Sequence, residues 1–398
     1  MSARKTVHHT EKLKVAILTT SFPIARGMTS GIFIQKLVNY LPSKIDVSVI
    51  APASVDLTDK FQEKKYQLHF IRYGPRRWQK LAHQPGGILV ALKQQKMMYF
   101  LLPVFISSMF IQCVRISRHR DLIHANWSIN GLVAGLAGLI TRKPVITTLR
   151  GSDINNIRTS IIFNFILKFC LALSSKVITV SDAFLKKLSC EYPAYRKKLF
   201  MIPNGVDPEL LQFPLEKQKK ICQLLTIGNI VPNKGMTLIV DALYSISDNN
   251  ISLNIVGDGV EKEKLKGDVV RYGLCSTIKF IGFLPPQKIY EKLRYADILI
   301  LSSYKEGRPN VVLEAMAAGV PVIASDIEGV RELIKNNVNG LLFEPGNSRE
   351  LSRRICQLRN DFDLRLRLAR TAREFIIENN LLWSNTGQLY ADLYQELI

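Results

Sequence analysis

The sequence lacks several features that would place it among secreted, metal-binding or disordered chains. Its six cysteines are scattered and show no paired metal-ligand spacing: Cys113, Cys170, Cys190, Cys222, Cys275 and Cys356. The first twelve residues are polar and contain no apolar core, so no secretory signal is visible. With 47% hydrophobic and 22% charged residues, the composition is that of a globular protein. We therefore expect a folded protein in a reducing, cytoplasmic compartment.

Acidic residues are scarce in the first half of the chain. Residues 1–200 carry 30 Lys and Arg against 9 Asp and Glu, whereas residues 201–398 carry 24 of each. The whole net charge of +21 therefore lies in the first half. Such a field predicts an anionic partner, which could be a phospholipid surface, a lipid pyrophosphate, an acidic glycan or nucleic acid. The alternative is a solvated basic face with no partner.

Short apolar runs recur along the chain and predict buried strands of parallel sheets. The clearest are Val15–Thr19 and Val145–Leu149. Further candidate strands cover residues 46–51, 68–73, 121–124, 176–180, 222–227, 278–284, 296–301 and 320–324. A chain of 398 residues is long enough for two domains built on such sheets.

One longer apolar run, residues 97–114, contains no charged residue and is just long enough to span a membrane. Pro103 and Gln112 interrupt it, and the next strand candidate would have to continue the same cytoplasmic sheet. We expect a helix packed against the sheet, with one edge at the bilayer interface, and keep a spanning helix as the alternative. The preceding segment is basic and aromatic and could contact an anionic leaflet through Arg72, Arg76, Arg77, Trp78, Lys80, Lys93 and Lys96.

The segment from residue 296 to residue 324 predicts a strand, a loop, a helix and a second strand. Pro309 suits the first turn of the helix, where its missing N–H has no cost, and Gly319 suits the position just after the helix ends. Two parallel strands joined in this way should have a right-handed crossover. Ligands of such sheets bind at the carboxyl ends of the strands, which places Glu306 and Gly307 at a binding site.

Glu314 is the unexpected residue of this helix, because its neighbours Val311–Ala317 are otherwise apolar. A buried carboxylate without a partner is costly. The helix dipole is a poor explanation, because its effect fades beyond the first turn. A basic side chain could satisfy the carboxylate structurally. Our preferred interpretation is that Glu314 accepts hydrogen bonds from a ligand with vicinal hydroxyls, such as a ribose.

Two glutamates separated by seven residues, within EGRPNVVLEAMAAGVPVIAS at residues 306–325, closely resemble the signature of retaining GT-B glycosyltransferases of family 4, the glycogen-synthase-like group. The resemblance implies that Glu314 binds the ribose of a sugar nucleotide and that Glu306, treated as catalytic, lies near the donor sugar. It also implies that the loop and helix N-terminus at Gly307, Pro309 and Asn310 hold the diphosphate, as helix N-termini bind anions.

The implied fold is α/β. Two Rossmann-like domains with doubly wound parallel sheets would face each other across a cleft. The resemblance assigns residues 1–205 to an acceptor-binding domain and residues 206–381 to a nucleotide-sugar-binding domain. The final helix, residues 382–398, would cross back onto the first domain.

Other segments match the family pattern less completely. Lys234-Gly235 match a pair that binds the donor diphosphate, but Asn229 stands where the family has arginine. Ser30-Gly31 correspond to a small-residue loop, often two glycines, that faces the donor phosphates. The resemblance assigns the donor site three more residues, which are Gly257 in a VGDG turn and Gly282 and Phe283 beside the nucleobase.

In the first domain, Arg150-Gly151-Ser152-Asp153 stand where the family has His-Gly-x-Asp, with the histidine close to the donor sugar. Arg150 keeps a fixed charge and could contact an anionic group, so we place it with Lys234 and Glu306 among the catalytic candidates. His124 ends another candidate strand and could face the cleft, or it could be a satisfied loop histidine. Asn204, in an interdomain Asn-Gly segment, and Asp153 complete the predicted acceptor side of the cleft.

The sequence therefore predicts a retaining glycosyltransferase that uses neither a metal nor a cofactor. It would move a hexose or a derivative from a UDP- or GDP-linked donor to a glycan or a lipid-pyrophosphate-linked acceptor, as in bacterial cell-surface polysaccharide assembly. Its charge suggests a peripheral location at the inner face of the membrane. The alternatives are a sugar-nucleotide epimerase, which the two glutamates argue against, and a nucleic-acid-binding protein, for which no known module is present.

Overall fold

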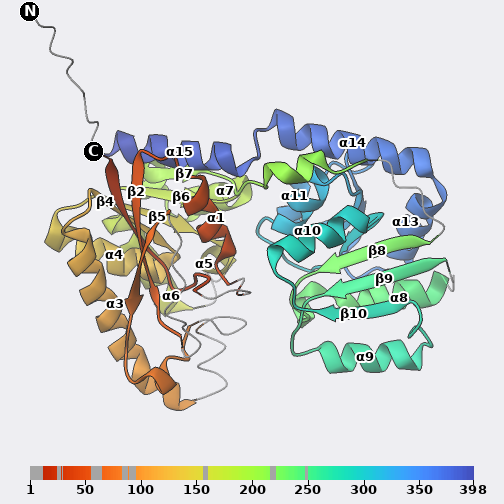
Figure 1. The fold of residues 1–398 in the computed structure, drawn as a ribbon, viewed down its shortest axis with the longest axis horizontal. Helices are drawn as coiled ribbons and strands as arrows, with labels where there is room; N and C mark the ends of the chain where they lie inside the picture. The colour runs from red at the N-terminus through yellow and green to blue at the C-terminus, as the bar shows by residue number, and fades with distance from the viewer. Residues whose placement is uncertain are drawn as a thin grey trace, which may run out of the picture.

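The computed structural model describes residues 12–24, 28, 30–54, 65–82, 88, 96–155, 160–215, 221–246 and 250–398. The chain forms two α/β units, each built on a wholly parallel sheet (Figure 1). We call the unit on the first sheet the N-terminal domain and the unit on the second sheet the C-terminal domain. The predicted fold class, two Rossmann-like domains of the GT-B type, is confirmed.

The N-terminal sheet has seven strands in the order β3-β2-β1-β4-β5-β6-β7. Their bounds are β1 Leu13–Leu18, β2 Ile45–Pro52, β3 Gln67–Ile71, β4 Leu122–Asn126, β5 Val145–Leu149, β6 Lys176–Thr179 and β7 Leu199–Met201. The strand order reverses between β1 and β4, which is where ligands of open α/β sheets bind.

Helices cover both faces of this sheet. They are α1 Ile32–Tyr40, α3 Leu101–Ser117, α4 Ser128–Thr141, α5 Gly151–Asn155, α6 Ile161–Leu173 and α7 Asp182–Glu191. Short 3₁₀ helices are η1 Arg76–Trp78, η2 Lys96–Phe100 and η3 Pro193–Lys198. Alternate side chains of β1 separate the two faces: Val15 and Ile17 pack toward α1, while Ala16 and Leu18 pack toward α3 and α4.

The C-terminal sheet has six strands in the order β10-β9-β8-β11-β12-β13. Their bounds are β8 Cys222–Ile227, β9 Ile251–Val256, β10 Ile278–Gly282, β11 Ile298–Leu301, β12 Val322–Ser325 and β13 Leu341–Phe343. Its helical elements are η4 Pro208–Gln212, η5 Pro232–Lys234, α8 Met236–Ile246, α9 Lys262–Arg271, α10 Pro286–Tyr295, α11 Asn310–Ala317, α12 Glu328–Arg331, α13 Ser348–Asn360 and α14 Phe362–Glu378. Here the strand order reverses between β8 and β11.

The last helix, α15 (Trp383–Glu396), returns to the N-terminal domain and packs against α1 (Figure 1). Trp383, Tyr390 and Tyr394 enter the same buried cluster as Val15 and Ile17. The chain therefore crosses between the domains twice, and Val206 N and Trp383 N bond the opposite crossing segment at 2.9 and 3.0 Å.

Local predictions agree with the structure at several elements. Strand β5 has the predicted bounds, and Gly319 follows α11 with a positive φ of 67°. Pro309 is the cap residue of α11, one position earlier than the predicted first turn. The apolar run at residues 97–114 forms most of η2 and α3, which packs on the sheet through Phe105 and Met109 on one side only.

Candidate functional site

Two neighbouring strand ends of the C-terminal sheet carry the first pair of site residues. Lys234 ends η5 in the loop after β8, and Glu306 lies in the loop after β11, the strand beside it. Lys234 Nζ lies 2.5 Å from Glu306 Oε1, and Ser303 Oγ donates to the same oxygen at 2.7 Å. Both side chains remain partly accessible, at 26% and 13%. A cation and a carboxylate therefore meet at the reversal point of the sheet.

Glu314 lies in α11 and faces the N-terminal domain. Lys36 of α1 reaches across the domain boundary, with its Nζ 3.8 Å from Glu314 Oε1 and 2.8 Å from Asp207 Oδ2. Burial raises the pKa of the Glu314 carboxyl, Lys36 lowers it, and the charge of Asp207 raises it further. The structure thus supplies a basic partner for Glu314, which was the alternative to a ligand contact. With 20% of its side chain still exposed, Glu314 remains accessible to a ligand.

Tyr290 of α10 completes this group of charges. Its hydroxyl bonds with Asp207 and with Lys36, whose Nζ also lies 5.0 Å from the centre of the Tyr290 ring. Burial and the nearby carboxylates raise the pKa of Tyr290 far above its ordinary value, so the phenol stays protonated. Asp207 therefore bonds both a cation, Lys36, and a neutral phenol, Tyr290, and the Tyr40 hydroxyl bonds it as well.

A second series of hydrogen bonds connects the two domains, and it begins at Arg150, just after β5. Its guanidinium donates to Asn126 Oδ1 at 3.0 Å and to Asn204 Oδ1 at 3.2 Å. Asn204 Nδ2 then donates to Asn310 Oδ1, at the start of α11, at 3.1 Å. The Arg150 guanidinium stacks 3.9 Å from the centre of the Phe33 ring. Among the described residues, the buried Arg150 Nε has no hydrogen-bond partner.

Burial lowers the pKa of Arg150 to about 10, which still leaves it charged at neutral pH. Asp153 is buried beside it and accepts from Ser128 N at 2.9 Å, Ser128 Oγ at 2.6 Å and Arg150 N at 2.9 Å. Burial raises the pKa of Asp153, and these hydrogen bonds oppose the rise. Asp153 therefore fixes the start of α4 and the loop that carries Arg150, which makes it a positioning residue.

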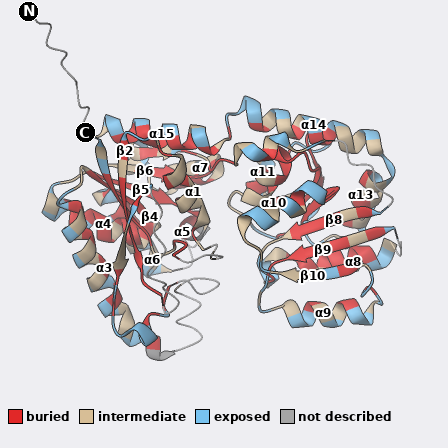
Figure 2. Ribbon diagram, in the orientation of Figure 1, coloured by how far each residue is buried: buried red, intermediate tan, exposed pale blue. Residues whose placement is uncertain are grey.

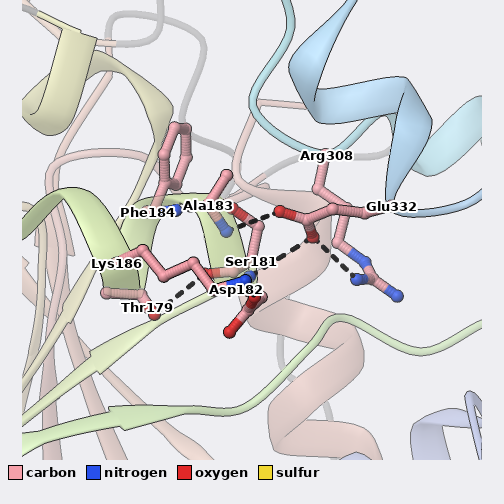
Figure 3. A network of polar contacts seen from close by, with 8 residues as sticks. All are labelled: Thr179, Ser181, Asp182, Ala183, Phe184, Lys186, Arg308 and Glu332. Carbon is pink, nitrogen blue, oxygen red and sulfur yellow. Dashed lines mark hydrogen bonds and ion pairs between the residues drawn. The ribbon is translucent and has the colours of Figure 1, made fainter.

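A third contact between the domains is centred on Glu332, just after α12 (Figure 3). Its carboxylate accepts from Ala183 N at 2.6 Å and Asp182 N at 3.3 Å, the first backbone amides of α7 in the N-terminal domain. Arg308 Nη1 lies 3.4 Å from the same carboxylate. A helix N-terminus favours negative charge, so Glu332 caps α7 from the other domain. Gly307 packs against α7 as well, because an added Cβ would lie 2.7 Å from the Phe184 ring.

A groove of about 780 Å³ opens on this side of the domain junction. Its lining includes Asp182, Pro203, Arg308, Glu332, Asn380 and Thr386. It does not contain Lys234, Glu306 or Glu314, so it is separate from the charged strand ends described above.

Comparison with known proteins identifies both halves of the chain. Residues 208–375 match the family model for glycosyl transferases group 1, and residues 30–210 match the model for glycosyltransferase family 4. An uncharacterized glycosyltransferase of Methanocaldococcus jannaschii is 30% identical over 278 residues, which is 70% of this chain and 76% of that relative. The chain belongs to the family 4 type of GT-B glycosyltransferases.

Other relatives of this glycosyltransferase cover more of its length. A putative teichuronic acid biosynthesis glycosyltransferase of Bacillus subtilis is 26% identical over 88% of this chain and 90% of its own. The solved structure of Anabaena HepE in complex with UDP aligns with a TM-score of 0.75 and 21% identity, over 97% of this chain and all of that one. The similarity to HepE is a similarity of fold alone.

One predicted cleft residue of the glycosyltransferase lies elsewhere. His124 is fully buried within β4, where its ring nitrogens bond Tyr394 Oη at 2.6 Å and Thr148 Oγ1 at 2.8 Å. The Tyr390 ring stacks on it at 5.2 Å. Burial, with the charge of Arg150, lowers the pKa of His124 to about 3. The cleft-facing prediction is wrong, because the returning helix α15 covers this side of the strand.

Of the predicted donor glycines, Gly257 and Gly282 lie at strand ends and Gly31 lies at the start of α1. Gly31 precedes α1 with φ 74°, and an added Cβ would lie 2.1 Å from Ser21 O, so only glycine fits there. Gly257 N donates to Gly282 O at 2.8 Å, which brings together the turns after β9 and β10. Phe283 is 54% exposed beside them, and Asn229 is exposed after β8.

The sequence reasoning overlooked an Asp-x-Asp sequence at Asp361–Asp363. Asp361 caps α14 by accepting from Leu364 N at 2.8 Å, which explains it structurally. Within the described ranges, no three His, Cys, Asp or Glu side chains lie close enough together to hold a metal ion.

Among the residues of the site that were missed from sequence are Lys36, Asn126 and Glu332. Asn126 ends β4, and its place at a strand end was an available signal. Lys36 is one lysine in an amphipathic helix, and Glu332 follows a four-residue helix. Neither had a local pattern that distinguished it, because both act on the opposite domain.

Proposed function

We propose that this glycosyltransferase moves a hexose or a hexose derivative from a nucleotide-diphosphate sugar, UDP- or GDP-linked, to a glycan or lipid-pyrophosphate-linked acceptor. The observation that carries the proposal is the pairing of Lys234 with Glu306 at 2.5 Å, at the strand ends that lead into the Glu314 helix. The structures of HepE with UDP and with UDP-glucose support a nucleotide-sugar donor.

The roles follow from charge and position. Glu314 accepts hydrogen bonds from the ribose hydroxyls. Lys234 and the amides at the start of α11 bind the diphosphate, and they stabilise its negative charge as the bond from the sugar C1 to the phosphate oxygen breaks. Glu306 orients Lys234 and lies beside the donor sugar. An acceptor oxygen bonds to C1 as the bond from C1 to the phosphate oxygen breaks, and its proton passes to an oxygen of the departing diphosphate. The nucleoside diphosphate leaves without help from a metal.

The acceptor would bind the N-terminal domain, where Arg150 supplies a cation that stays charged at neutral pH. An anionic group on the acceptor or on the donor sugar would be attracted to that cation. We infer retention of configuration from the family signature. Relatives that carry the names of teichuronic acid and amylovoran biosynthesis glycosyltransferases support a role in bacterial surface polysaccharides. The basic N-terminal half favours a peripheral place at the cytoplasmic face of the membrane.

The test is a panel of UDP- and GDP-sugars, in which release of the nucleoside diphosphate is measured with and without acceptor extracts. We expect one donor to be turned over by the wild type and not by Lys234→Ala. Asn229→Arg adds the second cation of the family pattern and should lower the KM for the donor. No turnover of any sugar nucleotide, or full activity of Lys234→Ala, would refute the proposal. Proton NMR of the product distinguishes retention from inversion.

A further inference from the structure

The outer helices of the N-terminal domain expose a large apolar surface. Helices α3, α4 and α6 lie side by side on one face of the sheet, with α3 and α4 away from the C-terminal domain (Figure 2). Along each helix, exposed apolar side chains recur every three or four residues, so they form one stripe per helix. We call these residues the apolar face: Phe100, Val104, Ile111, Leu136, Leu139, Ile140, Ile161, Ile162, Phe165 and Phe169.

The exposure of this surface is not a by-product of loose packing. The inner side of α4 is lined by Gly131, Gly135 and Gly138, and an added Cβ at Gly135 would lie 2.5 Å from Leu173 of α6. The helices therefore pack closely while their outer stripes stay in solvent. Leu139 is 65% exposed and Phe165 58% exposed. Exposed apolar patches of this extent mark interaction sites.

Charges around the apolar face are almost all positive. Arg115 and Arg118 lie at the end of α3, Arg142 and Lys143 follow α4, and Lys168 lies between Phe165 and Phe169 in α6. None of the five forms an ion pair with another described residue. From residue 96 to residue 176 the sequence has ten Lys and Arg but only two acids, Asp121 and Asp153. Asp121 accepts from Lys14 N at 2.7 Å, and Asp153 is buried.

We propose that the apolar face docks the N-terminal domain onto an anionic lipid bilayer, with the basic residues at the headgroups. An anionic leaflet offers both an apolar interior and negative charge, which matches both features of the surface. A second copy of the chain would instead bring the same basic residues against each other. The inference builds on the membrane location proposed above and assigns it to α3, α4 and α6 rather than to residues 72–96.

Helix α3 lies along the bilayer surface rather than across it. The run Met98–Ser117 is long and apolar enough to span a membrane by length and composition, and only 22% of an 18-residue stretch within it is buried. However, Phe105, Met109 and Cys113 are fixed in the core of the domain. Only four residues separate the end of α3 from strand β4, which pairs with both β1 and β5. The helix therefore cannot leave the domain without breaking its central strand.

The test uses the full chain with sedimenting vesicles of phosphatidylcholine, with and without phosphatidylglycerol. We expect binding only to the anionic vesicles, and release by salt. Phe165→Ser with Phe169→Ser should lower the partition coefficient by about tenfold or more, because two interfacial rings are lost. The matched control is Val260→Ser with Val270→Ser, which removes two side chains that are 80% and 67% exposed in the C-terminal domain. It should bind like the wild type.

A second pair of variants tests the charges. Arg118→Gln with Lys168→Gln should weaken binding and reduce its salt dependence, whereas Lys264→Gln with Lys279→Gln should not. Equal loss in both pairs, equal binding to neutral vesicles, or no vesicle binding would overturn the inference. So would a dimer, detected by light scattering, that Phe165→Ser with Phe169→Ser dissociates. Turnover of the donor in solution is measured in parallel, because unchanged turnover without vesicle binding refutes the docking surface and leaves the proposed function standing.

Discussion

Lys36 in the N-terminal domain lies 3.8 Å from Glu314 in the C-terminal domain, so the proposed ribose-binding carboxylate has a cation from the opposite domain. Burial raises the pKa of Glu314, and Lys36 opposes that rise. The ionised form of Glu314, which would accept the ribose hydroxyls, is therefore stabilised by the approach of the two domains. This relationship links the position of the N-terminal domain to the state of the donor site.

Replacing Lys36 by Met should make donor binding more sensitive to acid. In the wild type, affinity falls as pH drops through the pKa of Glu314, which lies above the ordinary carboxyl value. Without the Lys36 cation that pKa rises further, so the loss of affinity should begin at a higher pH. Calorimetric titration with a nucleotide sugar at several pH values measures the shift, because its diphosphate has no proton that titrates in this range. If donor affinity fell at the same pH in the wild type and in Lys36→Met, Lys36 would not act on Glu314.

His124→Leu should lower stability and leave the donor site intact. The change removes a hydrogen-bond partner of Tyr394, while Thr148 keeps Tyr390 as a partner at 3.0 Å, and an unsatisfied buried hydroxyl costs about 1–3 kcal/mol. The pKa of His124 is lowered to about 3, so its contribution to stability is complete above its unfolded pKa and declines as pH falls toward the folded value. Thermal unfolding measured between neutral and acid pH checks the predicted loss of stability. Donor affinity measured at neutral pH checks that the donor site is intact. A large loss of donor affinity with no loss of stability would show that His124 acts in the donor cleft after all.

Glu332→Ala should weaken the contact between the domains. Two backbone amides of α7 and Arg308 lose their shared acceptor, and hydrogen bonds to a charged group contribute about 1.5–3 kcal/mol each. We expect a larger radius of gyration by small-angle X-ray scattering and a higher KM for the donor. Glu328→Ala is the control, since Glu328 is an exposed carboxylate in the first turn of α12. Identical scattering from both variants would mean that Glu332 does not hold the domains together.

Local pattern was enough to predict the strand and helix around Glu314. Pro309, Gly319 and the apolar residues of α11 act within a few positions of one another, so the sequence carries that information. Val145–Leu149 was predicted correctly for the same reason, as a short apolar run with clear ends.

Contacts between distant segments could not be predicted. That Lys234 meets Glu306 depends on β8 and β11 being neighbours, which is a property of strand order. The pairing of Lys36 with Glu314 depends on how the two domains approach. The error at His124 has the same origin, because Tyr390 and Tyr394 reach it only when α15 returns from the far end of the chain.

The most direct test of the account is donor affinity and stability measured together in Glu314→Gln. Lys36 keeps Asp207 as a partner at 2.8 Å, so the change leaves no unpaired cation. The folded pKa of Glu314 is raised, so its ionised form opposes folding above the unfolded pKa, and Gln removes that cost. We predict that unfolding stability at neutral pH is unchanged or higher, whereas affinity for the donor falls about ten- to a hundredfold through lost charge-assisted hydrogen bonds. Unchanged donor affinity in a stable Glu314→Gln protein would contradict the account.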